Sequence, residues 1–236
     1  MTRFPDTRVS IVEALAADDP DRRRRALDLL VSAYRAPVLD ALRWRWNLDE
    51  PDAEDLTQAF FATALEKDWL ARFDPSRARF RTFLRLCAER FVANRMTAAG
   101  RLKRGGGRDV VPFDEGVLAS LPGADDPTEA RFRAEWVRSV FTLAVEALRE
   151  EALRRGRPVH LALFEAYDLC GAGDGERPSY AALARSHGLT ETQVLNHLAW
   201  ARRRMRAHVL EVLRRLAGSE AEYRDDVRDL LGIEPS

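Results

Sequence analysis

The stretch "DAEDLTQAFFATALE", residues 52–66, places four acids and one glutamine on a short segment with helical periodicity. Carboxylates grouped in this way are suited to acid–base catalysis, to metal binding or to contact with a partner protein. A catalytic pair of carboxylates needs one acid in an apolar pocket, so that the two pKa values separate. Here the acids gather at the start of the predicted helix, where the helix dipole favours the ionised form of each. The pattern therefore argues against catalysis by this helix.

Metal binding and other kinds of catalysis are not indicated either. A metal site needs converging ligands, and the histidines have no spacing typical of a zinc site. The histidines are His160, His187, His197 and His208. We find no nucleophile next to a base, and the glycine-rich "KRGGGR" at residues 103–108 lacks the helix signature of a phosphate-binding loop. We therefore predict no enzyme, no metal and no cofactor.

The charges balance overall but are segregated along the chain. The 38 basic and 38 acidic residues give zero formal net charge, which argues against binding nucleic acid by bulk attraction. Residues 49–55 ("DEPDAED") nevertheless contain only acids as charged groups, and residues 95–108 ("RMTAAGRLKRGGGR") contain only bases. Nearly all bases are arginines, whose planar guanidinium group suits phosphates and guanine edges.

The composition predicts a soluble protein. With 236 residues, 46% of them apolar, the chain has room for one large domain or two small ones. No apolar run is long enough to span a membrane and the first residues lack a signal-peptide core, so we expect a cytoplasmic protein with no membrane partner. Cys87 and Cys170 both lie in apolar stretches and are expected to be buried thiols.

Helical periodicity dominates and no strand pattern is convincing, so we predict an all-α fold. The N-terminal domain is expected at residues 10–104, with a helical pattern over 19–46 that kinks or restarts at Pro37. The acidic helix should begin at Pro51 and Asp52. Its expected buried row is Leu56, Phe60 and Ala64. A later helix should bury the face that carries Phe80, Leu84, Cys87 and Phe91.

Residues 105–125 are rich in glycine, proline and acids, and we interpret them as a flexible linker. The second domain is expected at residues 126–215. Within it, Gly188 makes a turn between two helices, and Thr190 with Gln193 forms a capping box that opens the second helix. The predicted buried stripe of that helix is Val194, Leu198, Ala201, Met205 and Val209. This pattern favours a helix-turn-helix over an ordinary helical hairpin with a solvated arginine face.

Taken in order, these segments resemble sigma factors of bacterial RNA polymerase, specifically the small extracytoplasmic-function (ECF) type. Residues 52–66 resemble the region 2.2 helix of that family. "FDPSRARFRTFLRLCAERFVANRM", residues 73–96, resembles regions 2.3 and 2.4. "SYAALARSHGLTETQVLNHLAWARRRMR", residues 179–206, resembles region 4.2. The resemblance covers most of residues 22–215.

The resemblance implies three contact surfaces on polymerase core and promoter DNA. The acidic helix would dock on the clamp helices of the largest polymerase subunit through Asp52, Glu54, Asp55 and Gln58. The minus-ten element would be read and melted by Asp74, Ser76, Arg77, Arg79, Arg81, Arg85, Asn94, Arg95, Arg101, Lys103 and Arg104. The minus-thirty-five element would be bound by Glu191, Thr192, Gln193, Asn196, His197, Arg202, Arg203, Arg204 and Arg206. The flap region of polymerase is a further expected contact, and an anti-sigma factor or a regulatory kinase is left open.

The sequence departs from its relatives at several positions of the minus-ten segment. Phe83 stands where many relatives have tryptophan, and Ala88, Glu89, Arg90 and Asn94 replace a common "ARN…D" pattern. Promoter preference is therefore not carried over from the family.

Residues 216–236 form an acidic tail for which we predict a short helix. Two roles are open: the tail caps the C-terminal domain, which we favour, or it folds back on an arginine face and restrains DNA binding. The rival to a sigma factor is a polymerase-independent DNA-binding regulator that uses the same helix-turn-helix, but this rival leaves the acidic helix unexplained.

Overall fold

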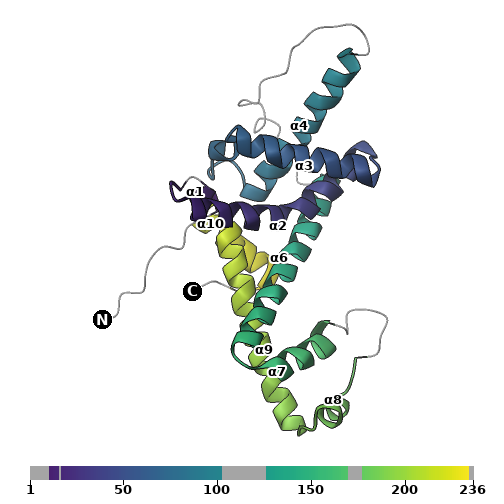
Figure 1. Cartoon of the computed structure of the whole chain (residues 1–236), viewed down its shortest axis with the longest axis vertical. Coiled ribbons are helices and arrows are strands. Elements are labelled where there is room, and N and C mark those ends of the chain that lie inside the picture. Colours follow the sequence, from purple (N-terminus) through teal and green to yellow (C-terminus); the bar gives the residue numbers. More distant parts are fainter. Residues whose placement is uncertain (1–10, 16, 103–125, 170–176, 234–236) are drawn as a thin grey trace, which may run out of the picture. The chain divides into compact units, whose positions relative to one another are not determined.

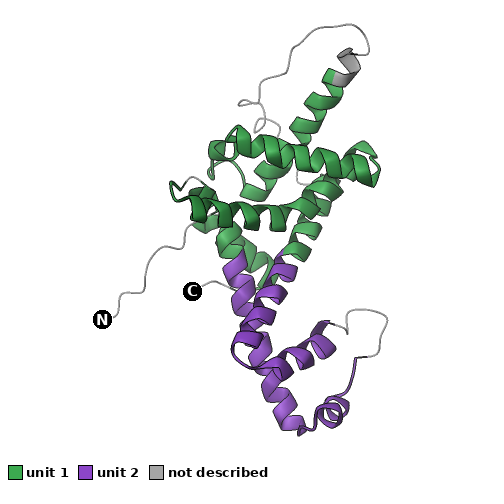
Figure 2. Ribbon diagram, viewed as in Figure 1, with its two compact units in different colours: residues 1–139, 213–236 green, residues 140–212 purple. Residues whose placement is uncertain are grey.

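A computed structural model describes residues 11–15, 17–102, 126–169 and 177–233 (Figure 1). These residues form helices joined by short loops and contain no strand, which confirms the predicted all-α fold. The chain divides into two compact units, shown in Figure 2. Unit 1 comprises residues 1–139 and 213–236, and unit 2 comprises residues 140–212. The unit boundaries fall within helices α6 (Pro127–Arg154) and α9 (Glu191–Leu216), whereas the predicted linker lies outside the described residues.

Unit 1 is built around helix α2 (Pro20–Trp46), which packs against α1 (Ile11–Leu15), α3 (Glu50–Glu66) and α4 (Phe80–Leu102). A short 3-10 helix, η1 (Trp69–Arg72), follows α3. The first part of α6, the end of α9 and helix α10 (Glu220–Leu231) complete the unit. Unit 1 therefore includes the C-terminal tail, which lies about 140 residues from α4 in the sequence.

Local sequence explains where the first long helices begin and end. Helix α2 begins directly after its N-cap residue, Asp19, whose carboxylate accepts hydrogen bonds from the backbone N–H groups of the first turn. It then runs through Pro37 as one helix, so the predicted restart does not occur, and Pro37 is buried in the core. Helix α3 begins at Glu50, close to the predicted start at Pro51 and Asp52, and is capped by Asp49, whose side chain accepts from the N–H of Asp52 at 2.9 Å.

The core of unit 1 is aromatic. Phe80 lies at its centre, with its ring 5.8 Å from that of Tyr34 and 5.2 Å from that of Phe73. The predicted face of α4 is buried, but residues 83, 86 and 88 are buried as well. The first turns of α4 are therefore enclosed on all sides rather than on one face. On α3, Phe60 and Ala64 are buried as predicted, whereas Leu56 is only half-buried.

Unit 2 contains the rest of α6, helix α7 (Pro158–Phe164), a π-helical turn η2 (Glu165–Leu169), α8 (Tyr180–His187) and most of α9. Gly188 ends α8 with φ at 65°, a backbone conformation that glycine adopts without strain. The capping box at the start of α9 is confirmed, since Gln193 N–H donates to Thr190 Oγ1 at 3.2 Å and Thr190 N–H donates to Gln193 Oε1 at 2.8 Å. The predicted buried stripe of α9 is also confirmed.

Candidate functional site

The outer face of α3 carries exposed acidic and amide groups. Asp52, Asp55 and Gln58 are exposed, while the opposite face of the helix packs into the core of unit 1. Glu54 is half-buried and accepts a hydrogen bond from the Arg35 guanidinium at 2.9 Å. Three of the four predicted contact residues are thus presented to solvent on one helix, and the fourth is held by an ion pair within the chain.

The loop before α4 forms a small polar turn. The Asp74 carboxylate accepts hydrogen bonds from Ser76 Oγ at 2.7 Å and from the Ser76 backbone N–H at 2.9 Å. These bonds lower the pKa of Asp74, so this carboxylate is ionised at neutral pH. Arg77 is exposed, and its Nε lies 3.8 Å from Asp74. The predicted residues at positions 74, 76 and 77 therefore form one accessible group.

Arg79 lies among three carboxylates of α10. Its Nη1 donates to Asp226 at 3.3 Å and to Asp229 at 3.2 Å, and its Nη2 donates to Asp225 at 3.2 Å. The Arg79 side chain keeps 32% of its surface exposed. This arginine is accessible to water, but its donors are directed at the tail of the same chain.

Arg81 and Arg85 are buried, with 3% and 1% of their surface exposed. Arg81 pairs with Asp226 and lies over the ring of Trp136 at 4.8 Å. Burial opposes the charge of Arg81, but the Asp226 carboxylate outweighs this and raises the pKa of Arg81. Because the side chains are enclosed in the core, their position argues against the predicted contact with DNA.

Arg85 is held by acids from two segments of unit 1. Its Nε donates to Glu129 at 2.8 Å, and its Nη1 pairs with Glu89 and lies 3.3 Å from Asp126. Burial raises the pKa of Glu89, although the nearby arginines oppose this shift. The Arg85 guanidinium thus ties α4 to the start of α6.

The remaining minus-ten candidates lie further along α4 or beyond it. Asn94 is half-buried, and Arg95 is exposed with its guanidinium 5.0 Å from the ring centre of Phe91. Arg101 is in the last turn of α4. Lys103 and Arg104 lie outside the described residues, as does Cys170. Cys87 is buried as predicted, and burial raises the pKa of its thiol.

In unit 2, the start of α9 presents an exposed polar face. Glu191, Thr192 and Asn196 are exposed. Gln193 is exposed too, but its side-chain oxygen is occupied by the capping box. His197 is half-buried with its ring 3.9 Å from that of His160, and burial lowers the pKa of both imidazoles. The first turns of α9 therefore offer three side chains that are free of structural hydrogen bonds among the described residues.

The arginines of α9 fall into two groups. Arg202 forms a two-point pair with Asp168 at 2.9 Å, and Arg204 donates to Glu151 at 2.8 Å. Arg203 and Arg206 are exposed and form no ion pair with any residue that the structure describes. The second group is available for a charged partner, whereas the first stabilises unit 2.

Comparison with known proteins identifies one segment of unit 1. Residues 30–102 match the family model described as Sigma-70 region 2. The match supports a sigma-70 family factor; members of that family act in RNA polymerase-directed transcription, and the family is not one of enzymes. A region 2 domain implies binding to RNA polymerase core. No curated protein and no solved structure matches the chain.

The region 2 segment, residues 30–102, contains the acidic face of α3, the Asp74 turn and all of α4. It ends before α6, α9 and α10. Among the described residues, no cluster of histidine, cysteine and acidic side chains could hold a metal ion, and no helix is both long enough and apolar enough to cross a membrane.

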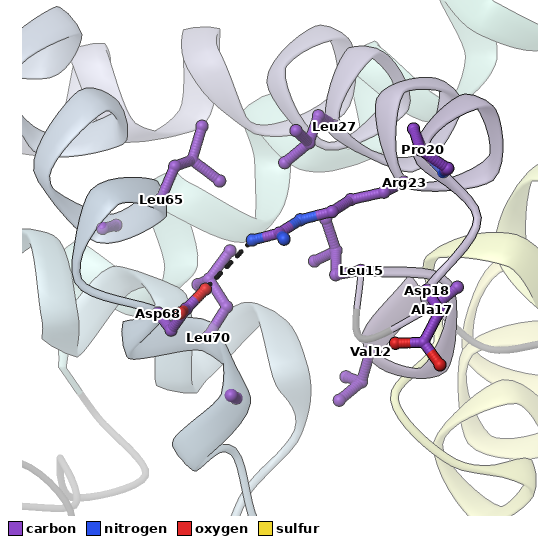
Figure 3. Close-up of a pocket in the computed structure, with 12 residues that line it drawn as sticks. Val12, Leu15, Ala17, Asp18, Pro20, Arg23, Leu27, Leu65, Asp68 and Leu70 are labelled. Atoms are coloured by element: carbon purple, nitrogen blue, oxygen red, sulfur yellow. Dashed lines mark hydrogen bonds and ion pairs between the residues drawn. The ribbon is translucent and has the colours of Figure 1, made fainter.

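Two features near this segment were not predicted from the sequence. The first is the pair of buried acids Glu222 and Asp226 on α10, which contact the start of α4. The second is a cavity of about 470 Å³ at the edge of the region 2 segment, lined by α1, α2, the end of α3 and η1. Figure 3 shows the cavity, with the ion pair of Arg23 and Asp68 at 3.0 Å beside its apolar wall. Only the acidic composition of the tail signalled the first, and no sequence pattern signalled the second.

Proposed function

We propose that the chain is an ECF-type sigma factor that binds RNA polymerase core and directs initiation at particular promoters. The observation that carries this proposal is the Sigma-70 region 2 match over residues 30–102, in which an exposed acidic helix face precedes an exposed polar turn. An initiation factor needs no active site of its own, because it acts by positioning polymerase on DNA.

The acidic face of α3 is the proposed contact for polymerase. Asp52, Asp55 and Gln58 are exposed and contact the clamp helices, and Glu54 contributes less because Arg35 already holds it. Carboxylates on a rigid helix steer a basic partner surface into register and raise the rate of association. Charge reversal at the centre of this face should therefore weaken the complex.

The proposed minus-ten contacts are the accessible members of the predicted set. The Asp74 turn, with Ser76 and Arg77, supplies donors and acceptors for an unstacked base, and Arg95 supplies a cation further along α4. Capture of an unstacked base on one DNA strand requires this combination of polar groups and nearby positive charge.

The proposed minus-thirty-five contacts lie in unit 2. The succession of α8, the left-handed Gly188 and the capped α9 supports a helix-turn-helix whose second helix enters the major groove. Glu191, Thr192 and Asn196 would read base edges, while Arg203 and Arg206 would bind phosphates.

Run-off transcription tests the proposal. Purified polymerase core is combined with the wild-type chain, with Asp55→Arg or with Asp28→Arg, on fragmented DNA from the source of the protein. Asp28 is exposed on α2 outside the region 2 segment, so its reversal gives the same change of charge away from the acidic face. We expect discrete transcripts with wild type and Asp28→Arg, and a loss of about tenfold or more with Asp55→Arg, since reversing one interfacial charge costs more than about 1.4 kcal/mol.

Other outcomes would contradict the proposal in distinct ways. If wild type gives no discrete starts but binds duplex DNA tightly without polymerase, the chain is an independent regulator. If Asp28→Arg reduces transcription as much as Asp55→Arg, the acidic face of α3 is not the polymerase contact.

A further inference from the structure

Helix α10 is joined to the start of α4 by buried hydrogen bonds. The Glu222 carboxylate accepts from the backbone N–H of Phe80 at 2.9 and 3.0 Å and from that of Gly218 at 2.9 Å. A side chain at Gly218 would overlap the Phe73 ring, so the chain before α10 packs directly on the loop that leads into α4. The C-terminal helix therefore lies on the loop–helix junction of the region 2 segment.

The acids of α10 that contact this junction differ in how far they are buried. Asp226 is buried and pairs with the buried Arg81, and together with Glu222 it anchors the helix. Asp225 and Asp229 are more exposed, with 44% and 39% of their side-chain surface accessible, and both are bound to Arg79 at 3.2 Å. Asp226 also accepts from Arg79 at 3.3 Å, but Asp225 and Asp229 contact Arg79 without anchoring the helix, so these two acids can be changed while the anchors are kept.

Of the arginines that contact the acids of this junction, Arg79 is one that a DNA strand could still reach. It follows the accessible Arg77 by two residues in the sequence, while Arg81 and Arg85 are enclosed. The donors that would bind a phosphate are directed at carboxylates, which are themselves charged oxygen acceptors. Helix α10 carries five acids and two arginines, so it also places negative charge where a phosphate backbone would approach.

We propose that α10 is an intramolecular mask of the nucleic-acid-binding surface, in which Asp225 and Asp229 occupy Arg79 in place of DNA phosphates. The inference rests on the proposed function, because it assigns a regulatory role to the minus-ten surface. Exposed ion pairs of this kind are weak, since water and salt screen both partners. The mask therefore lowers the affinity of the free protein for DNA, and it yields when other contacts hold DNA at the same place.

The test neutralises the mask and leaves its anchors intact. Asp225→Asn/Asp229→Asn keeps the shape of both side chains and the buried acids. The control Asp28→Asn/Glu220→Gln makes the same change of net charge with exposed acids that do not contact Arg79; Glu220 pairs with Arg214 and Arg224. The probe is a fluorescein-labelled single-stranded DNA of about 20 nucleotides and mixed sequence, longer than a typical binding site for a single-strand-binding domain.

We expect Asp225→Asn/Asp229→Asn to bind the probe about three- to tenfold more tightly than the control, because its two exposed ion pairs with Arg79 are lost. Adding Arg79→Ala to Asp225→Asn/Asp229→Asn should remove this gain in affinity, because the gain comes from the Arg79 guanidinium. Asp229 also lies 3.7 Å from Arg133, and Asp225 pairs with Arg228, so the Arg79→Ala arm separates the proposed contact from these neighbours.

The proposed mask would be overturned if Asp225→Asn/Asp229→Asn and the control bound the probe with equal affinity. It would also be overturned if the gain in affinity remained after Arg79→Ala was added. If Asp225→Asn/Asp229→Asn loses helical signal in circular dichroism, the single variant Asp225→Asn is used instead, with Glu220→Gln as its control. The expected gain in affinity is then smaller. The assay contains no polymerase, so a gain here together with failed run-off transcription would refute the proposed function and retain the mask. Successful run-off transcription without a gain in affinity for the probe would refute the mask alone.

Discussion

Replacement of Glu222 is expected to destabilise unit 1 more than replacement of any exposed acid on α10. The Glu222 side chain is 5% exposed, and its carboxylate is the acceptor for the Phe80 and Gly218 N–H groups. Burial raises the pKa of Glu222, and these two backbone donors oppose the shift. The carboxylate thus supplies the acceptor for one buried backbone N–H, that of Phe80, and one partly buried backbone N–H, that of Gly218.

The magnitude follows from those two groups. A buried donor that loses its acceptor costs about 1–3 kcal/mol, and the partly buried Gly218 N–H adds less, so Glu222→Ala should lower the free energy of unfolding by about 2–4 kcal/mol. Glu222→Gln keeps one acceptor oxygen and removes the cost of burying a charge, so it should lose only about 1–2 kcal/mol. The full loss in the alanine variant appears only while α10 stays docked, since release of the helix exposes both N–H groups to water.

Urea unfolding followed by far-ultraviolet circular dichroism measures these differences, and hydrogen exchange of the Phe80 amide reports the bond directly. Glu220→Ala is the control, because its exposed pairs contribute about 1 kcal/mol or less. Our reasoning would be refuted if Glu222→Ala unfolded within about 0.5 kcal/mol of wild type and Phe80 kept its protection from exchange.

Two further predictions concern the buried arginine of α4 and the histidine pair of unit 2. Arg85→Met should cost about 1–3 kcal/mol in thermal unfolding because the partly buried Glu129 loses its charged hydrogen-bond donor, whereas Arg77→Met should stay within about 0.5 kcal/mol; equal stability would refute the structural role of Arg85. His160 and His197 should titrate below the ordinary value of 6.5, since burial and nearby positive charge disfavour their protonation. Because folding lowers these pKa values, unit 2 should lose stability as the pH falls below 6.5, and an NMR titration with both values at or above 6.5 would contradict this.

Local patterns predicted much of the fold. The period of apolar residues placed the buried stripe of α9, and the Thr190 to Gln193 spacing placed its start, because both depend on neighbours within one or two turns. Of the two outcomes predicted at Pro37, a restart does not occur, since α2 continues through this residue and packs against three other helices. Tertiary contacts can override a local preference that costs only a few kcal/mol.

The docking of α10 could not be predicted in the same way. The bond between Glu222 and Phe80 joins residues 142 positions apart, and an acidic tail could pair with any of several basic segments. The sequence suggested two roles for the tail without giving the arginine face that it contacts. Burial of Arg81 and Arg85 was missed for a related reason, because an amphipathic pattern predicts one buried face and α4 is enclosed all round at its start.

Burial therefore separates arginines that the sequence presents as one cluster. The Arg85 guanidinium, at 1% exposure, contacts three partly buried carboxylates, so removing it takes away the cation that joins α4 to the start of α6 and threatens the fold. Arg79, at 32% exposure, can exchange its carboxylates for water or for phosphate at little cost. A loss of promoter binding after substitution at position 85 would then report unfolding, whereas substitutions at the more exposed positions 77, 79 and 95 can report contact with DNA.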